Sequence, residues 1–378
     1  MKFVIAPDKY KGSLTGLEFC EAVCEGMQAV FPEALIMYKP LADGGDGTLA
    51  VVRHYLEADT IKVLVNDPLF RKREVEYLLS KDKRTAFIEL SEASGYKLLR
   101  KDELNCMSTT TLGTGELVVD ALNRGAKEII LGIGGSATND GGMGIAVALG
   151  YEFLDSNKNI LSPVGDQLIK VNEIRKSNLH PRLSEVNIKV ACDVRNPFFG
   201  TNGAAYIYGP QKGASREEVE FLDKGLQHFA TIIKQQFGMD IQKISGSGAA
   251  GGVGGGTIVF LNATLHSGID LIKEIAGFDA AIVNADWIIT GEGRLDSQTL
   301  SGKTIAGVLE SAKKRHIPVA ALCGAVALSP EHQEKMGLTY VCAILRDVSN
   351  LDQVIAKSKE NLVAAAYNFA KLIEANCR

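Results

Sequence analysis

Hydrophobic and polar positions follow two different periods near the start of the chain, and the change of period marks the expected elements. Two short apolar runs, 2–7 and 34–40, predict strands. Between them, apolar residues recur at the spacing of one helical face, and Thr15 with Glu18 forms a capping box that sets the start of this helix. A second helical pattern covers 48–57. Strand, helix, strand, helix predicts a parallel α/β sheet that begins at the first residue.

The pattern changes after residue 60. Three successive strand patterns leave no room for helices between them, so they predict an antiparallel meander and a second domain that begins near residue 66; they cover 60–68, 71–80 and 84–95. Helices are then expected over 114–126, 144–153 and 215–238, and buried strands over 127–135 and 187–194. Ser215 and Glu218 form a second capping box.

Parallel α/β character returns near residue 280. The expected order is strand 280–290, helix 302–316, strands 317–324 and 340–345, and a final helix 351–375. The simplest assembly lets this last part complete the sheet that the first residues begin. We therefore predict an α/β protein of two domains, with residues 1–66 and 281–378 in a discontinuous first domain and residues 67–280 inserted as the second.

Composition and charge exclude several classes of protein. The net charge is −4 without a long run of one sign, which argues against a nucleic-acid partner. No apolar stretch approaches the length that crosses a membrane, and the first residues have the pattern of a core strand rather than of a signal peptide. The seven cysteines are scattered without a C-x-x-C pair, which indicates a reduced, cytoplasmic protein. The six histidines show no zinc-ligand spacing, and a homo-oligomer stays open.

Glycine is the unusual residue, with 39 in 378, and it is clustered. Most clusters follow apolar runs, where glycine lets backbone N–H groups approach a ligand closely; they span 41–48, 112–116, 131–144, 200–203, 245–256 and 290–294. So many separate polar glycine loops argue against a third class, a binding module without catalysis.

The cluster "LGIGGSATNDGG" allows two interpretations. Gly132, Gly134 and Ala137 match a relaxed dinucleotide fingerprint, and Glu152 and Asp155 follow at about the expected distance. An NAD(P)-dependent oxidoreductase is therefore the alternative to a kinase. However, "TNDGGMG" lengthens the loop before the next helix, and the same glycine-rich loop would serve the phosphates of a nucleotide equally well.

Polar groups gather where apolar runs end, which is where ligands bind in open α/β sheets. They are Asp8, Lys9, Lys11, Ser13, Asp43, Asp46, Asp193, Arg195, Asn196, Glu292, Arg294 and Asp296. Carboxylates supply Mg²⁺ ligands and a base, and Lys and Arg supply charge for anions, so the mixture suits phosphoryl transfer to a hydroxyl of an acidic substrate. Asp193 is the leading candidate for base or metal ligand because it ends a buried strand.

The tripeptide Gly302-Lys303-Thr304 has the ending of a nucleotide-binding P-loop. Ser297 stands where that loop requires its first glycine, and the preceding strand ends too far away at Thr290. The segment therefore does not predict a P-loop. Ser301 is instead expected to cap the following helix.

Eight motifs, in order, resemble those of the type-I glycerate kinases. They are "APDKYKGSLT", "PLADGGDGT", "GTGEL", "GIGGSATNDGG", "ACDVRNPFFGTNGAA", "YGPQKGA", "GAAGGVGGG" and "DWIITGEGRLDSQTLSGKT". The resemblance implies ATP-dependent, Mg²⁺-assisted phosphorylation of D-glycerate, most simply to 2-phosphoglycerate. It also implies a flavodoxin-like domain, split in sequence, with an inserted domain of restriction-enzyme-like topology. Tyr10 and Asp46 depart from the family's usual phenylalanine and glutamate.

The resemblance assigns no role to single residues, so the following roles are our own predictions. Catalytic residues are Asp193, Asp43 and Lys11. Substrate-binding residues are Lys9, Ser13, Arg294 and Asp296. Nucleotide-binding residues are Gly134, Gly135, Ser136, Thr138, Asn139, Gly251 and Gly252. Metal ligands are Asp193, Asp286 and Glu292. A kinase of a related small hydroxy acid is a further alternative.

Overall fold

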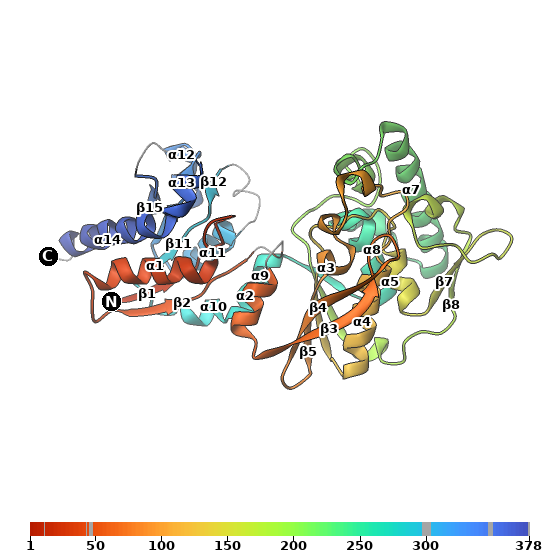
Figure 1. The fold of residues 1–378 in the computed structure, drawn as a ribbon, viewed down its shortest axis with the longest axis horizontal. Helices are drawn as coiled ribbons and strands as arrows, with labels where there is room; N and C mark the ends of the chain where they lie inside the picture. Colours follow the sequence, from red (N-terminus) through yellow and green to blue (C-terminus); the bar gives the residue numbers. More distant parts are fainter. Residues whose placement is uncertain (11, 43, 45–47, 297–303, 347–350, 377–378) are drawn as a thin grey trace. The chain divides into compact units, whose positions relative to one another are not determined.

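The chain divides into two compact units. The computed structural model describes residues 1–10, 12–42, 44, 48–296, 304–346 and 351–376 (Figure 1). Unit 1 comprises Met1–Asp43 and Ile269–Arg378, and unit 2 comprises Gly44–Gly268. Each unit has its own sheet and its own core.

Unit 1 is built on a five-stranded sheet whose strands are all parallel, in the order β15-β13-β11-β1-β2. The strands are β1 (Lys2–Ile5), β2 (Leu35–Tyr38), β11 (Trp287–Thr290), β13 (Val319–Cys323) and β15 (Tyr340–Ala343). Counted within the unit, the order is 2-1-3-4-5. The winding therefore reverses between β1 and β11, and ligands of open α/β sheets bind at such a reversal.

Helices flank this sheet. They are α1 (Gly16–Gln28), α9 (Gly268–Ala276), α10 (Phe278–Ala281), α11 (Thr304–Lys313), α12 (Pro330–Met336), α13 (Leu351–Ala356) and α14 (Ser358–Asn376). The capping box of Thr15 and Glu18 opens α1 as predicted. A Cβ on Gly26 would lie 2.4 Å from the Val363 carbonyl oxygen, so glycine lets α1 and α14 pack closely side by side (Figure 1).

Unit 2 is built on a six-stranded sheet in the order β10-β9-β6-β5-β4-β3. Strands β3 (Ala58–Asn66), β4 (Lys72–Ser80) and β5 (Thr85–Glu89) form the predicted antiparallel meander. Strands β5, β6 (Glu128–Gly132), β9 (Asn187–Ala191) and β10 (Thr264–His266) are parallel, so their carboxyl ends meet at one edge. A separate hairpin pairs β7 (Tyr151–Leu154) with β8 (Glu173–Lys176).

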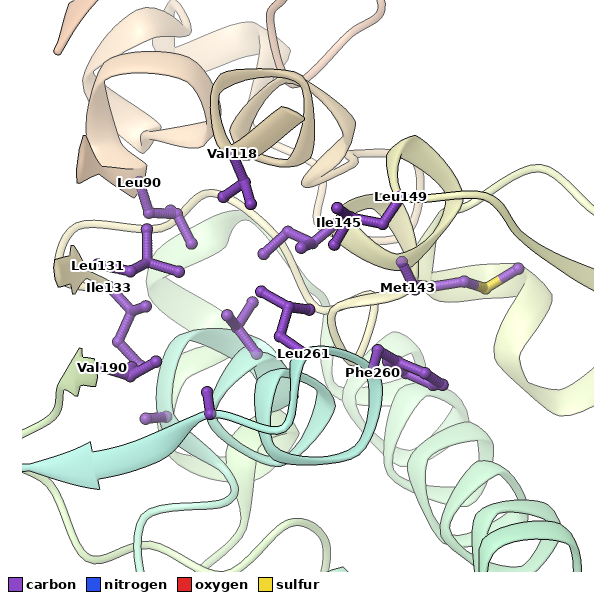
Figure 2. Packing of buried hydrophobic residues seen from close by; sticks show 14 of the residues in the cluster. Leu90, Val118, Leu131, Ile133, Met143, Ile145, Leu149, Val190, Phe260 and Leu261 are labelled. Carbon is purple, nitrogen blue, oxygen red and sulfur yellow. The ribbon is translucent and has the colours of Figure 1, made fainter. Parts of the chain in front are cut away.

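The helices of unit 2 enclose one apolar core. They are α2 (Thr48–Tyr55), α3 (Leu90–Ser94), α4 (Leu112–Arg124), α5 (Met143–Ala148), α6 (Ala204–Tyr208), α7 (Arg216–Phe237) and α8 (Ala249–Leu261). The capping box of Ser215 and Glu218 opens α7 as predicted. Figure 2 shows Ile133 and Met143 in the core, so the glycine-rich segment between them is anchored at both ends.

The unit boundaries differ from those expected. We placed residues 44–66 with the first domain, but β3 pairs with β4 over its whole length and belongs to the sheet of unit 2. Conversely, residues 269–280, which we placed in the insertion, belong to unit 1. The domain to which a strand belongs depends on the strand with which it pairs, and the local sequence does not indicate which strand that is.

Two predicted elements are shorter than expected. The helix predicted over 144–153 ends at Ala148, because Gly150 has φ +98° and its Cβ would lie 1.9 Å from the Asn178 carbonyl oxygen; β7 follows instead. The strand predicted over 280–290 begins only at Trp287, because Asn284 has φ 57°, which interrupts an extended chain.

Candidate functional site

The carboxyl ends of β1 and β11, on either side of the winding reversal, bring Asp8 and Thr304 together in unit 1. The Asp8 N–H donates to the Gly291 carbonyl at 2.9 Å, which joins the two strand ends. Asp8 Oδ2 accepts a hydrogen bond of 2.7 Å from Thr304 Oγ1, at the first residue of α11. Asp8 is one of the polar groups expected at a strand end but has no role predicted from the sequence, and Thr304 stands out there only as the end of the P-loop-like tripeptide.

The predicted substrate-binding residues belong to unit 1 as well. Arg294 is on the two-residue strand β12 (Arg294–Leu295), which pairs with β14 (Ala325–Val326). Its side chain is 67% exposed and lies 3.4 Å from Asp296, and such an exposed ion pair leaves the guanidinium able to exchange partners. Lys9 follows Asp8 and donates its N–H to that carboxylate at 2.7 Å. The Ser13 hydroxyl is buried, and no described residue forms a hydrogen bond with it.

Several predicted residues lie outside the described part of the chain. They are Lys11, Asp43, Asp46, Ser297, Ser301, Gly302 and Lys303. Helix α11 is described from Thr304 onward, so the predicted cap of this helix stays a prediction.

Asp286 lies at the opposite edge of the sheet of unit 1 from Glu292. Asp286 precedes β11 and accepts the Lys2 N–H at 2.6 Å, at the amino end of β1, whereas Glu292 follows β11. The strand between them spans about 13 Å at ~3.3 Å per residue. These two carboxylates therefore cannot ligate one ion, and this part of the predicted metal site is wrong.

In unit 2, Asp193 lies beyond the carboxyl end of β9, at the edge where the parallel strands end. Its side chain is exposed, and Oδ1 accepts the Gly268 N–H at 2.8 Å. Gly44 lies against it, with the position of a Cβ 3.2 Å from the Ala191 Cβ and 3.9 Å from Asp193 Oδ2. Asp193 is therefore accessible to a ligand. Its hydrogen bond with Gly268 also holds the last residue of unit 2 in place.

The glycine loop 133–142 follows β6 at the same edge. Gly134 and Gly135 are exposed, whereas Ser136 is nearly buried and Thr138 and Asn139 are fully buried. The Thr138 hydroxyl and both polar atoms of the Asn139 amide have no hydrogen-bond partner in the part of the chain that the structure describes. Of the residues predicted to hold a nucleotide, the exposed pair can therefore meet a ligand directly, and Thr138 and Asn139 lie behind it.

The second glycine segment packs behind the first. Gly251 has φ +70°, and its Cβ would lie 2.0 Å from the Thr138 carbonyl oxygen. Gly252 also has a positive φ, and Gly141 donates its N–H to the Gly251 carbonyl at 3.0 Å. The predicted nucleotide residues of the two clusters are thus brought together, but the second cluster is buried and supports the first.

A buried carboxylate, Asp140, gives the first loop its shape. It accepts four hydrogen bonds, of 2.8 and 2.7 Å from the N–H and hydroxyl of Thr111, 3.2 Å from Gly142 and 3.1 Å from Gly144. Burial raises the pKa of Asp140, and these donors oppose the rise. The carboxylate therefore ties the loop to the first turns of α4 and α5.

The dinucleotide fingerprint does not form. A fingerprint loop opens a helix directly after the strand, whereas α5 begins only at Met143 and Ala137 instead donates its N–H to Ser94. Glu152 lies in the β7–β8 hairpin and pairs with Arg175, rather than following a neighbouring parallel strand. The oxidoreductase alternative therefore loses its structural basis.

Lys212 lies behind the glycine loop and has no role predicted from the sequence. Lys212 is 3% exposed, and its Nζ donates to Ser136 Oγ and to the Thr138 carbonyl, both at 2.7 Å. Burial lowers its pKa to about 8. A lysine in a polar glycine-rich segment is ordinarily solvated, and only the motif "YGPQKGA" could have drawn attention to it.

The carboxylates fit a magnesium ion that is completed by a substrate. Within the described ranges, no three His, Cys, Asp or Glu side chains gather closely enough to form a metal site. Mg²⁺ is usually held through one or two carboxylates together with substrate phosphates, so exposed or half-buried carboxylates such as Asp193 and Glu292 suit it. Among the described helices, none has the length and apolar character that crossing a bilayer requires.

Comparisons with known proteins agree over the whole chain. A family model described as the glycerate kinase family matches residues 3–374. A glycerate kinase from Halalkalibacterium halodurans is 42% identical over 367 residues, covering 97% of each chain. A glycerate 2-kinase from Escherichia coli is 40% identical over 378 residues, covering 100% of this chain and 99% of the relative.

A solved structure agrees as well. The chain superposes with a TM-score of 0.90 on a protein assigned as glycerate kinase 2 from Salmonella typhimurium LT2. The two are 39% identical, and the match covers 100% of this chain and 99% of the other.

Proposed function

Because the chain belongs to the glycerate kinase family, a family of enzymes, we propose that it transfers a phosphoryl group from ATP to D-glycerate and forms 2-phosphoglycerate. The observation that carries this proposal is the full-length similarity to a relative named for the 2-position. A kinase of a related small hydroxy acid is the second candidate, because the exposed guanidinium of Arg294 would donate hydrogen bonds to any small carboxylate.

The exposed Gly134–Gly135 turn supports the nucleotide part of the proposal. Its glycines let backbone N–H groups approach phosphate oxygens, and a rigid, buried polar layer supports it from behind. For the acceptor, Lys9, Ser13 and Arg294 are the proposed ligands of the glycerate carboxylate, with Asp296 setting the orientation of Arg294. Lys11 and Asp43 keep the catalytic roles predicted from the sequence.

The reaction needs a base for the acceptor hydroxyl. We assign this role to Asp193, whose carboxylate is exposed beyond the end of β9. It would take the proton of the 2-hydroxyl while that oxygen forms its bond to the γ-phosphorus and ADP leaves. Asp193 and Glu292 each keep the metal-binding role predicted from the sequence, and Mg²⁺ would neutralise phosphate charge when bound.

We also propose a fold family for each of the two units. The strand order 2-1-3-4-5 of unit 1 supports a flavodoxin-like domain, split in sequence. For unit 2, the restriction-enzyme-like topology implied by the family resemblance is part of the proposal, supported by the mixed six-stranded sheet.

The test is a coupled ADP-release assay with ATP and Mg²⁺ over D-glycerate, L-glycerate, glycolate and lactate, with the phosphorylated position read by NMR. We expect D-glycerate to give by far the highest kcat/KM and the phosphate to be on the 2-oxygen. Equal or better turnover of another acid would replace D-glycerate by that acid. ADP release that stays at the no-acceptor rate with all four acids would refute the proposal.

A further inference from the structure

The glycine loop 133–138 covers a positive charge that has no ion-pair partner among the described residues, and the buried carboxylate of Asp140 raises the pKa of Lys212 only in part against the effect of burial. The Nζ of Lys212 bonds two neutral oxygens, of Ser136 and Thr138, and the ion pairs of the described residues do not include it. A buried ammonium is costly unless it is compensated, and its lowered pKa reports this cost. An anion bound at the outer side of the loop would add to the partial compensation that Asp140 supplies.

The backbone holds Lys212 in place. Lys212 ends the 3₁₀ turn η5 (Pro210–Lys212), and its carbonyl accepts the Cys106 N–H at 3.2 Å. The next residue, Gly213, has φ +92°, and its Cβ would lie 2.1 Å from the Leu104 carbonyl oxygen. This turn is therefore packed from both sides, and the ammonium is a fixed support of the loop.

Ser136 links the buried ammonium of Lys212 to the surface of the loop. An ammonium can only donate, so the Ser136 hydroxyl accepts from Nζ and directs its own proton elsewhere. Among the described residues, that proton and the N–H groups of Gly134 and Gly135 have no protein acceptor. Both glycines are exposed and Ser136 is 6% exposed, so the turn presents polarised donors to solvent.

We propose that Lys212 is the positioning residue of a phosphate-binding turn, Gly134–Ser136, and that it acts on the nucleotide's phosphates through the Ser136 hydroxyl. The inference rests on the proposed function for the identity of the ligand as a nucleotide. Lys212 itself does not touch the ligand, because it lies beneath the turn.

Bound phosphate would raise the proton affinity of Lys212, so binding near pH 8.5 draws a proton from solution. The other titratable groups that face Lys212 are Asp140 and Cys106, with Glu218 beside Cys106. Burial raises the pKa of Cys106 to about 11, so the thiol keeps its proton in this window. Asp140 already accepts four hydrogen bonds, and Glu218 belongs to the capping box of α7.

The experiment is calorimetric titration of the full-length protein with ADP at pH 8.5 in two buffers of different ionisation enthalpy. We expect the wild type to take up a fraction of a proton on binding. Lys212→Met should abolish this uptake and weaken ADP binding by about tenfold to a hundredfold, as expected for a charge-assisted contact. Ser136→Ala should weaken binding less, and the double variant should bind no worse than Lys212→Met.

Lys273→Met is the matched control. Lys273 is also a buried lysine, 6% exposed, but it belongs to unit 1 and pairs with Asp270 at 3.0 Å. This variant should bind ADP with the affinity and proton uptake of the wild type. A folded Lys212→Met protein that does the same would overturn the proposal.

Two further outcomes are decisive. If Lys212→Met does not fold, Ser136→Ala is the variant that tests the proposal. The proposal is refuted if Ser136→Ala binds ADP as tightly as the wild type and the wild type takes up no proton on binding. A wild-type protein that binds no ADP refutes it as well. If ADP binding depends on Lys212 while D-glycerate is not phosphorylated, this inference holds and only the acceptor in the proposed function is wrong.

Discussion

The stability of unit 2 should depend on pH through Lys212 in a direction that the structure specifies. Burial lowers the pKa of Lys212 from 10.5 to about 8, so the folded state binds this proton more weakly than the unfolded state. Below pH 8 both states carry the proton and the folded state bears the full cost of burying the charge. As pH rises from 8 to 10.5 the folded state releases the proton first, so the free energy of unfolding increases.

The size of this effect follows from the difference in pKa. One pKa unit corresponds to ~1.4 kcal/mol, so the contribution of Lys212 amounts to roughly 3 kcal/mol between pH 7 and pH 10.5. Other lysines, tyrosines and cysteines titrate in the same range and would mask this contribution in the wild type alone. The useful quantity is therefore the difference in unfolding free energy between wild type and Lys212→Met, since the other contributions cancel in it.

The assay is urea denaturation of both proteins at several pH values, followed by circular dichroism. We expect the wild type to gain about 3 kcal/mol over Lys212→Met as pH rises from 7 to 10.5. The single tryptophan, Trp287, lies in β11 of unit 1, so its fluorescence gives a separate record of that unit. A difference between the two proteins that stays constant with pH, or that changes in the opposite sense, would refute the assigned burial of a charged lysine.

Three further predictions concern the proposed site and the packing around it. Arg294→Ala should lose ~100-fold or more in kcat/KM for D-glycerate, because a cation that meets developing charge is lost, whereas Lys303→Ala should lose far less; the reverse order in the same assay would mean that the loop has been misread. Asp193→Asn should keep its circular dichroism spectrum and lose most of its activity, and a folded, active variant would assign the base elsewhere. Gly113→Ala should lower the free energy of unfolding by at least ~2 kcal/mol, because its Cβ would lie 1.8 Å from the Asn66 carbonyl oxygen; an unchanged denaturation midpoint would contradict this.

Local signals in the sequence predicted local structure well. Both capping boxes, at Thr15 and Ser215, open the helices they predict, because a capping box is completed within four residues. The meander of β3, β4 and β5 was also predictable, since short connections force neighbouring strands to pair. By contrast, the end of α5 depends on Gly150, whose conformation is set by a contact with Asn178 far along the chain.

The candidate site was predictable only in part, for a related reason. The strand-end rule placed Asp193 and Arg294 in exposed positions, but it could not show that Asp286 lies at the other edge of its sheet. The hydrogen bond between Asp8 and Thr304 joins residues that are 296 positions apart in the sequence. Whether a lysine is solvated or buried depends on the tertiary surroundings, and Lys212 was therefore missed.

The two ends of unit 2 lie next to each other: a Cβ on Gly44 would be 3.1 Å from the Gly268 Cα. A domain with adjacent ends can be placed in a surface loop of a host while its host pays almost no added loop-closure entropy, whatever the length of the insert. Unit 2 thus has the geometry of an inserted domain that can be moved from one host protein to another. A short linker could therefore join residues 44 and 268 in a circular permutant of unit 2. Unit 2 could likewise be exchanged between relatives, with both junctions at these two glycines.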